Sequence, residues 1–355
     1  MNIYLVGGAV RDHFLGLEVK DRDYVVVGSS NQELLDAGFS CVGMGFPVYL
    51  HPETREEYAL ARRETKVGAG YTGFEFETAD VTLEEDLSRR DLTINSMAMG
   101  PEGIPIDPFG GMSDLKNKLL RHTSGAFAED PLRVIRLARF YARYKPMGFR
   151  VANRTKILVG DMAEDGSLNE IPDERFWLEL EKVFTEENPK FFFDLLWEIG
   201  ALKNVSFFQR MLGKVTEKDL ARIMNLATAS MILDTPKQRL AAFTSLVNPL
   251  GTSAPTSDLA IYCRMGFCPE PEKVLDLFQK IRAFSEGPRA ENLIDAVLIW
   301  EIANLNSAMP MSSKKLRQAL EAARTVTAAP FIHLEGPEIG IQMSFARVEK
   351  IKSVL

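Results

Sequence analysis

Two aspartates, Asp21 and Asp23, are separated by one arginine and directly precede the β-branched run from Tyr24 to Val27. Residues two apart in an extended chain point to the same face, so the two carboxylates lie side by side at the start of a predicted strand. Carboxylates that close repel each other unless a cation lies between them, and hard oxygen ligands suit Mg²⁺. The pattern indicates a magnesium site. An isolated pair of this kind more often marks a polar strand entrance, so both interpretations stay open at this point.

A glycine turn lies one predicted helix upstream of this acidic pair. Gly7 and Gly8 stand between an apolar, strand-like run from Ile3 to Val6 and a predicted helix from Val10 to Leu17. Glycines let a ligand approach the backbone closely, a helix N-terminus presents unpaired N–H groups that suit phosphate, and Arg11 adds a forked cation. The order therefore places a phosphate cradle beside a two-carboxylate metal site, as phosphoryl transfer requires.

Further polar residues could complete such a site. Glu57, at the start of a predicted strand, is a candidate third carboxylate, and its alternative role is that of a solvated hairpin residue. A dense polar cluster follows from Glu84 to Asn95. Arg90 in this cluster could clamp a triphosphate, and Asp91 or Asn95 could contact a ribose. The alternative is a helix stabilised by ion pairs within it.

A second basic segment begins after Asp130. Pro131 suits the first turn of a helix, and the helix predicted after it carries arginines on one stripe about 120° wide. The stripe comprises Arg133, Arg136, Arg139 and Arg143, opposite Val134, Leu137 and Tyr141. A solvated basic face is the usual interpretation of such a stripe, but arginines without interleaved acids favour an anionic partner.

The elements that must position these residues change in character along the chain. Residues 1–120 alternate short apolar runs with helical segments, which predicts a small mixed α/β sheet, and a basic glycine-rich stretch from Arg62 to Gly73 is typical of a mobile loop. From Asp130 onward apolar residues recur at helical spacing. Helices are predicted over 131–144, 173–184, 189–199, 218–232, 236–246, 257–265, 271–284, 290–305 and 312–325.

Composition limits the class of protein. The 355 residues carry a formal net charge of −7, which argues against a large, indiscriminate polyanion-binding surface. Cys41, Cys263 and Cys268 are too few for a disulfide framework and lack neighbouring histidines for a zinc site, so we expect buried thiols in a reducing cytosol. No signal peptide and no membrane-spanning run is predicted, and we expect a cytoplasmic protein. The sequence does not indicate an oligomeric state.

At these residues the chain resembles the tRNA nucleotidyltransferases, or CCA-adding enzymes, of the bacterial and eukaryotic class within the polymerase-β-like superfamily. The likeness covers about residues 1–185, is greatest to the proteobacterial form, and rests on motifs that are modest alone and specific together. These are Gly7-Gly8-Ala9-Val10-Arg11-Asp12 with Asp21-Arg22-Asp23, Arg89-Arg90-Asp91, Asp107-Pro108-Phe109-Gly110-Gly111, and Glu129-Asp130-Pro131-Leu132-Arg133.

The resemblance implies an architecture and a set of roles. It implies a nucleotidyltransferase head over 1–120, a helical neck with the nucleotide-selecting motif over 121–200, and a helical body and tail that bind tRNA over 201–355. Asp21 and Asp23 would be catalytic and would bind Mg²⁺, whereas Asp130 and Arg133 would pair with the incoming base. The other nucleotide contacts implied are Gly8, Arg11, Arg90, Arg136 and Arg139. Asp107 to Gly111 matches a hinge between head and neck, and the loop from Arg62 to Gly73 matches one used in switching to adenosine addition.

The implied reaction is addition of C, C and A to the 3′ end of tRNA from CTP and ATP, without a template and with release of pyrophosphate. A bacterial poly(A) polymerase shares this head, but the acidic pI of about 5.4 and the lack of a basic tail argue against it. Enzymes that add only CC or only A are further alternatives. A non-catalytic RNA- or nucleotide-binding protein is disfavoured, because two unneutralised acids beside RNA would weaken binding.

The C-terminal part departs from the proteobacterial relatives, which often carry an HD-type phosphohydrolase domain with His-Asp metal ligands. The histidines here are His13, His51, His122 and His333, and none is followed by aspartate. We therefore expect no HD domain and no phosphohydrolase activity.

Overall fold

The computed structural model divides into two compact units, which we describe separately. Unit 1 comprises Met1–Glu179 and Leu195–Ser206, and unit 2 comprises Leu180–Asp194 and Phe207–Leu355. The structure describes residues 1–42, 47–66, 68, 74–202, 204–205, 223–225, 227–233, 235–236, 238–239, 243, 258, 262, 269–285, 288–303 and 310–355. Within these residues no helix is long and apolar enough to cross a membrane.

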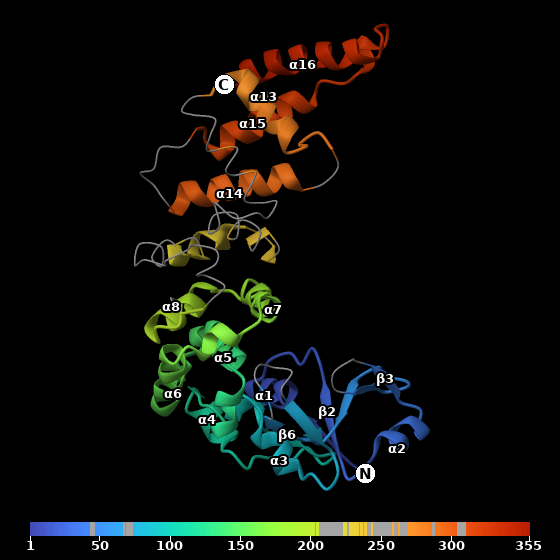
Figure 1. Ribbon diagram of the computed structural model, residues 1–355, viewed down its shortest axis with the longest axis vertical. Helices are drawn as coiled ribbons and strands as arrows, with labels where there is room; N and C mark the ends of the chain where they lie inside the picture. The colour runs from blue at the N-terminus through green and yellow to red at the C-terminus, as the bar shows by residue number, and fades with distance from the viewer. Residues whose placement is uncertain are drawn as a thin grey trace. The chain divides into compact units, whose positions relative to one another are not determined.

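Unit 1 contains a mixed sheet of seven strands, as predicted (Figure 1). In spatial order the strands are β3 (Ser40–Val42), β4 (Val48–Leu50), β5 (Glu57–Leu60), β2 (Asp23–Val27), β1 (Asn2–Val6), β8 (Ala98–Met99) and β9 (Pro105–Ile106). Strand β2 pairs antiparallel with β1 and parallel with β5. The register places Asp23 opposite Val6 on one side and Glu57 on the other. The end of β1 and the start of β2 therefore lie next to each other, at the edge where the glycine turn begins.

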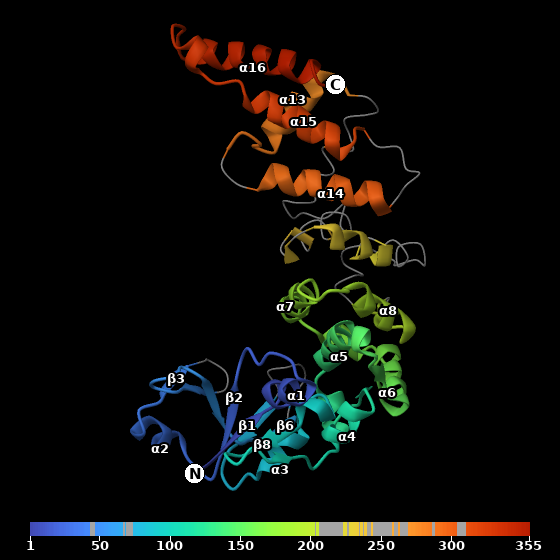
Figure 2. The same ribbon diagram turned by 180° about the vertical axis from the view of Figure 1, so that it is seen from behind.

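Both faces of the central strand are buried, which explains its uninterrupted apolar sequence. Val25 packs in a cluster with Leu87, and Val26 packs in a second cluster with Leu34. Because neighbouring residues of a strand face opposite sides, the sheet is covered on one face by α3 (Leu83–Ser88) and on the other by α2 (Asn31–Asp36). Figure 2 shows the strands from the reverse side.

The predicted elements of the head are largely present, with shifted ends. The helix after the glycine turn is α1 (Gly8–Leu15), and α2 begins after Ser30, which forms a capping box with Glu33. One prediction is wrong in part: the stretch expected as a mobile loop begins with strand β6 (Arg63–Lys66), paired antiparallel with β7 (Phe74–Glu77). The pairing was missed because β6 has no apolar residue. Residues 67 and 69–73 lie outside the described residues.

The rest of the chain is largely helical, as predicted. Unit 1 adds α4 (Gly111–Lys116), α5 (Leu132–Tyr144) and α6 (Asn153–Glu164), with a short parallel pair of strands, β10 (Leu119–Leu120) and β11 (Arg150–Val151). The next helices along the chain are α7 (Asp173–Val183) and α8 (Lys190–Glu198). Unit 2 contains α13 (Pro271–Lys280), α14 (Arg289–Ala303), α15 (Ser313–Arg324) and α16 (Gly336–Lys352).

The helical part of the chain contains a helix that was not predicted, and some of the predicted helices fall on residues that the structure does not describe. Helix α16 was not predicted, because Gly336, Pro337 and Gly340 weaken its helical pattern. Of the helix predicted over 218–232, residues 223–225 and 227–229 are helical and Ser230–Ile232 form a 3-10 helix, whereas residues 218–222 and 226 lie outside the described residues. The helices predicted over 236–246 and 257–265 lie mostly outside the described residues, and so do Cys263 and Cys268. Cys41 is exposed, so the expectation of buried thiols is wrong at this position. The division into head, neck, and body with tail stays a prediction.

The segment from Asp107 to Gly111 forms a tight junction within unit 1. The Asp107 carboxylate accepts hydrogen bonds from the backbone N–H groups of Gly111 at 2.7 Å and Met112 at 2.8 Å, which caps α4. A Cβ atom on Gly111 would lie 2.8 Å from Met97 Sδ and would also overlap the Thr93 carbonyl oxygen. Glycine at this position therefore lets α4 pack directly on the segment that carries Thr93 and Met97.

We expect Gly111→Ala to lower the free energy of unfolding by about 1–3 kcal/mol, because the added methyl group overpacks a closed contact. The measurement is urea unfolding followed by circular dichroism. Gly160→Ala is the matched control: Gly160 lies inside α6, and its Cβ atom would meet nothing within 4 Å. Higher helix propensity should make that variant more stable by about 0.5–1 kcal/mol. Equal midpoints for both variants would contradict this account of Gly111.

Candidate active site

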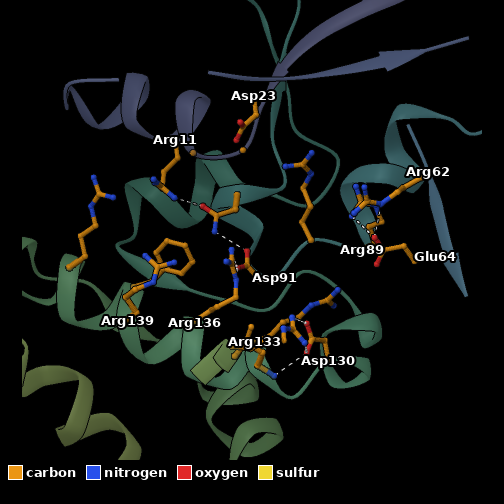
Figure 3. A pocket seen from close by; sticks show the side chains of 18 of the residues that line it. Arg11, Asp23, Arg62, Glu64, Arg89, Asp91, Asp130, Arg133, Arg136 and Arg139 are labelled. Carbon is orange, nitrogen blue, oxygen red and sulfur yellow. Dashed lines mark hydrogen bonds and ion pairs between the residues drawn. The ribbon is translucent and has the colours of Figure 1, made fainter. Parts of the chain in front are cut away.

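A cavity of about 620 Å³ opens in unit 1 and is lined by an excess of cationic side chains. Among the residues that the structure describes, nine arginines and four carboxylates line it: Arg11, Arg62, Arg89, Arg90, Arg133, Arg136, Arg139, Arg143 and Arg175, and Asp23, Glu64, Asp91 and Asp130. These residues come from α1, the start of β2, the β6–β7 ribbon and the residue before it, the segment that follows α3, helix α5 and the segment before it, and α7; Figure 3 shows ten of them with labels. Such an excess of positive charge selects an anionic ligand.

Of the predicted metal ligands, Asp23 lines the cavity and Asp21 lies two residues before it. Partial burial raises the pKa of Asp23, the Arg90 cation lowers it, and the nearby Asp21 carboxylate raises it. The two acids therefore interact as like charges, as the sequence predicts. Mg²⁺ is commonly bound by one or two carboxylates together with water and substrate phosphates. This donor set fits such an ion, and the assignment stays a prediction.

The candidate third carboxylate does not complete a metal cluster. Glu57 is the backbone partner of Asp23 in the parallel β2–β5 pair. However, among the residues that the structure describes, no three His, Cys, Asp or Glu side chains are grouped closely enough to hold a metal ion. The two carboxylates of Asp21 and Asp23 are therefore the donor set that remains.

The glycine turn brings a cation against the backbone. Gly7 has a positive φ of 68°, and a Cβ atom there would lie 2.9 Å from Arg90 Nη1. Gly8, which lines the cavity, starts α1, and no side chain caps that helix. The first N–H groups of α1 and the Arg90 guanidinium therefore lie together, an arrangement that suits a phosphate group.

Arg90 belongs to a cluster of ion pairs at the end of α3. The fully buried Asp86 carboxylate accepts hydrogen bonds from Arg89 at 2.7 Å and from Arg90 Nη2 at 3.2 Å. These pairs have the i,i+3 and i,i+4 spacing of the alternative interpretation, but both arginines lie just beyond Ser88, the last residue of α3. The buried Nε of Arg90 has no hydrogen-bond partner in the described part of the chain. A buried donor without a partner is rare, and a phosphate oxygen would satisfy it.

Arg11 is fixed by two acceptors beneath the glycine turn. It donates to the Asp12 carboxylate at 2.8 and 3.0 Å and to Asn95 Oδ1 at 2.5 Å. The Asn95 amide in turn donates to Asp91 at 2.8 Å. Asn95, oriented by Asp91, thus fixes the Arg11 guanidinium, whereas the sequence suggested either residue as a ribose contact.

Asp91 also anchors the arginine helix. Arg136 donates to its second oxygen at 2.8 Å. Burial alone would raise the pKa of Asp91, but the Arg136 cation and hydrogen bonds from Asn95 and Leu92 lower it to about 2. The carboxylate is therefore ionised at neutral pH and links α5 to the turn below α1.

The arginine stripe of α5 has acidic partners from other elements. Glu179 of α7 accepts a hydrogen bond from Arg139 at 2.6 Å and lies 3.7 Å from Arg136, whereas Arg143 lies 3.6 Å from Asp12. Arg133 and Arg139 are buried, so the stripe is not the solvated basic face that such a pattern usually indicates. Val134 and Leu137 on the opposite side are fully buried, as predicted.

The two residues predicted to select the base are held by separate partners. The Asp130 carboxylate accepts hydrogen bonds from both terminal nitrogens of Arg175, at 3.1 and 2.9 Å. It also accepts a hydrogen bond from the Leu132 backbone N–H at 3.1 Å, which caps α5. Arg133 donates to the Ala126 carbonyl, and burial lowers the pKa of this arginine. Both side chains line the cavity, and Figure 3 shows them near its lower edge, across from Asp23.

Sequence reasoning missed the residues that support this arrangement. Arg175 and Glu179 lie four residues apart on α7, and that spacing on a predicted helix was the available signal. Asp12 is part of the glycine motif but was given no role, and Glu64 lies in the stretch that was expected to be a mobile loop. The structure brings the predicted residues Gly8, Asp23 and Arg90 into one cavity with Arg11, Asp130, Arg133, Arg136 and Arg139.

Comparisons with known proteins agree with this architecture. Solved structures described as a CCA-adding enzyme in apo form II and as a Thermotoga maritima CCA-adding enzyme complexed with tRNA match with TM-scores of 0.70 and 0.67. Both are 20% identical in sequence and cover 99% of this chain and 90% and 87% of their own. A CCA-adding enzyme with CTP matches with a TM-score of 0.65 at 23% identity over 99% of this chain and 87% of that one. At these identities the matches establish the fold.

Two family models match the sequence itself, and together they cover half of it. Residues 3–121 match the poly A polymerase head domain. Residues 148–207 match the model described as the probable RNA and SrmB-binding site of polymerase A. With this head and this RNA-binding segment, the chain belongs to the poly(A) polymerase family of nucleotidyltransferases, and it shares the fold of the CCA-adding enzymes.

Proposed function

We propose that the protein adds C, C and A to the 3′ end of tRNA, using CTP and ATP and releasing pyrophosphate. One observation carries this proposal: the acid and arginine able to pair with a base, Asp130 and Arg133, share one cavity with Asp23 and the glycine turn. Groups for base selection and groups for phosphoryl transfer thus serve the same ligand, with no need for a second centre.

The reaction joins the 3′-hydroxyl of the RNA to the α-phosphate of the nucleotide and breaks the bond to the β-phosphate. A magnesium ion bound by Asp21 and Asp23 would make the hydroxyl more acidic and offset the charge of the triphosphate. The N–H groups at the start of α1, together with Arg11 and Arg90, would hold the triphosphate in line. Arg136 and Arg139 would contact the nucleotide from α5.

A carboxylate and a guanidinium can together select C and A. Cytosine and adenine both present an exocyclic amino donor next to a ring-nitrogen acceptor, which Asp130 and Arg133 complement as acceptor and donor. Uracil and guanine present a carbonyl oxygen next to a ring N–H, so each contact would set like against like. An unpaired buried polar group costs about 1–3 kcal/mol, enough to disfavour the wrong base at each contact.

The alternatives concern the product more than the chemistry. A poly(A) polymerase would use the same cavity with ATP alone, and its family is named by both matched models. The acidic pI of about 5.4 favours a selective RNA substrate over varied ones. Enzymes adding only CC or only A stay open as alternatives.

The deciding assay gives purified protein three tRNAs: one lacking the terminal CCA, one ending in CC, and one complete. Each receives labelled CTP and ATP, separately and together. We expect C and A to be added in order and addition to stop at CCA. A long A tail on any of the three RNAs would show a poly(A) polymerase instead.

Removal of the acidic pair tests the metal assignment. We expect Asp21→Ala with Asp23→Ala to reduce CTP incorporation by about 10³-fold or more, because the metal contributes several kcal/mol to the transition state. Glu57→Gln, on the neighbouring strand, is the matched acidic control and should retain most activity. Magnesium-dependent incorporation that persists in the double variant would place the metal elsewhere.

Removing the arginine that orients the Asp130 carboxylate tests base selection without substituting Asp130 or Arg133. Arg175→Gln removes both hydrogen bonds that orient the Asp130 carboxylate, so we expect the KM for CTP and ATP to rise about tenfold. Incorporation of UTP relative to CTP should also increase. Arg154→Gln, an exposed arginine outside the cavity, is the control. Unchanged selectivity in Arg175→Gln would mean that Asp130 needs no orientation from α7.

A further inference from the structure

An aromatic side chain at the cavity has no place in the roles described so far. Phe76 of β7 lines the cavity, yet 42% of its surface is exposed. The other aromatic residue in the lining, Phe140, is only 5% exposed. Phe140 is also covered by the guanidinium groups of Arg139 at 4.4 Å, Arg11 at 5.5 Å and Arg136 at 5.7 Å. Among the described residues of the lining, Phe76 is thus the aromatic residue whose surface a ligand can reach.

The register of the β6–β7 ribbon fixes the direction of this ring. Phe76 is paired directly with Glu64, so the two side chains lie on the same face of the ribbon. Arg63 and Glu77, one position along, form the next pair, and their 2.8 Å ion pair lies on the opposite face. That face is tied to α3 by the Arg63–Glu85 ion pair at 2.5 Å. The face with Arg63 and Glu77 is therefore attached to α3, and the face with Glu64 and Phe76 lines the cavity.

A guanidinium held in place supports the ring. Arg62 lies 5.3 Å from the centroid of the Phe76 ring. The Arg62 Nε donates a hydrogen bond to the Glu64 carboxylate at 2.7 Å, and the same carboxylate accepts a hydrogen bond from Arg89 Nη1 at 2.8 Å, as Figure 3 shows. The Arg62 backbone N–H is bonded to Asp86 at 3.2 Å. Phe76 is therefore part of a preorganised cation–π pair, not a loosely placed surface residue.

The charges next to Phe76 also act on the base-selecting arginine. Burial lowers the pKa of Arg133, Glu64 raises it and Arg89 lowers it further. Glu64, the cross-strand partner of Phe76, and Arg89 therefore lie near enough to Arg133 to act on its charge.

We propose that Phe76 is a stacking platform for a nucleobase in the cavity. The proposal rests on the proposed nucleotide addition. Stacking is tolerant of sequence, because every base has a π face. Successive addition presents different terminal bases to one cavity, so a contact that does not read hydrogen bonds serves each of them. The base that stacks is either the terminal base of the RNA or that of the incoming nucleotide.

Two probes distinguish these sources. The first is a tRNA with 2-aminopurine at its 3′ end, and the second is 2-aminopurine riboside triphosphate; stacking quenches the fluorescence of both. Phe76→Leu removes the ring, Phe76→Tyr keeps it, and Leu35→Ala is the control, since Leu35 is a similarly exposed apolar residue (44%) on α2, outside the cavity. Circular dichroism and thermal unfolding would verify that all variants are folded.

We expect Phe76→Leu to lose quenching of the RNA probe or of the nucleotide probe, and to raise the KM of that same substrate about tenfold, whereas kcat changes little. Phe76→Tyr and Leu35→Ala should behave as the unmodified protein. Quenching and KM values that are unchanged in a folded Phe76→Leu protein would overturn the proposal. Binding of the RNA probe requires no addition of C or A, so a failure of the proposed function remains distinguishable from a failure of this inference.

Discussion

The Asp91 carboxylate joins the parts of unit 1 that must act together. It is buried, accepts hydrogen bonds from Asn95 and Arg136, and keeps a pKa of about 2 in spite of its burial. Through Asn95 it fixes Arg11 below the glycine turn, and through Arg136 it fixes α5. Loss of one partner from a buried charge pair costs about 3–5 kcal/mol. The proposed phosphate-binding and base-selecting sides of the cavity therefore depend on one ionised group.

The same constraint explains why the cavity contains carboxylates at all. Nine arginines around one anion-binding space would repel each other in the free protein. Three of the acids in the lining hold arginines of the same lining: Glu64 holds Arg62 and Arg89, Asp91 holds Arg136, and Asp130 holds Arg175. These pairs fix the guanidinium planes before a ligand arrives, which lowers the ordering cost of binding. The excess of positive charge that remains is available to a triphosphate and to RNA.

Sequence alone predicted the parts of this site that are local in the chain. The glycine turn, the acidic pair and the arginine helix have characteristic spacings, and the period of the apolar residues predicted the α/β head and the helical remainder. Spacing could not predict partners brought together by folding, such as Arg175 with Asp130 or Glu179 with Arg139. It also missed the β6–β7 ribbon, whose strand β6 has no apolar pattern and carries the cross-strand ion pair Arg63–Glu77.

The two sides of the cavity differ in the kind of groups that form them, and this difference decides which substitutions could change the choice of base. The side proposed to bind phosphate is built from backbone N–H groups and from Arg90, whose position requires glycine at residue 7. That geometry is intolerant of substitution and does not distinguish one base from another. The side proposed to select the base is built from side chains that are oriented by α7 and by the β6–β7 ribbon. If these roles hold, changes in the supporting elements alter which base is selected while the groups proposed for phosphoryl transfer stay as they are.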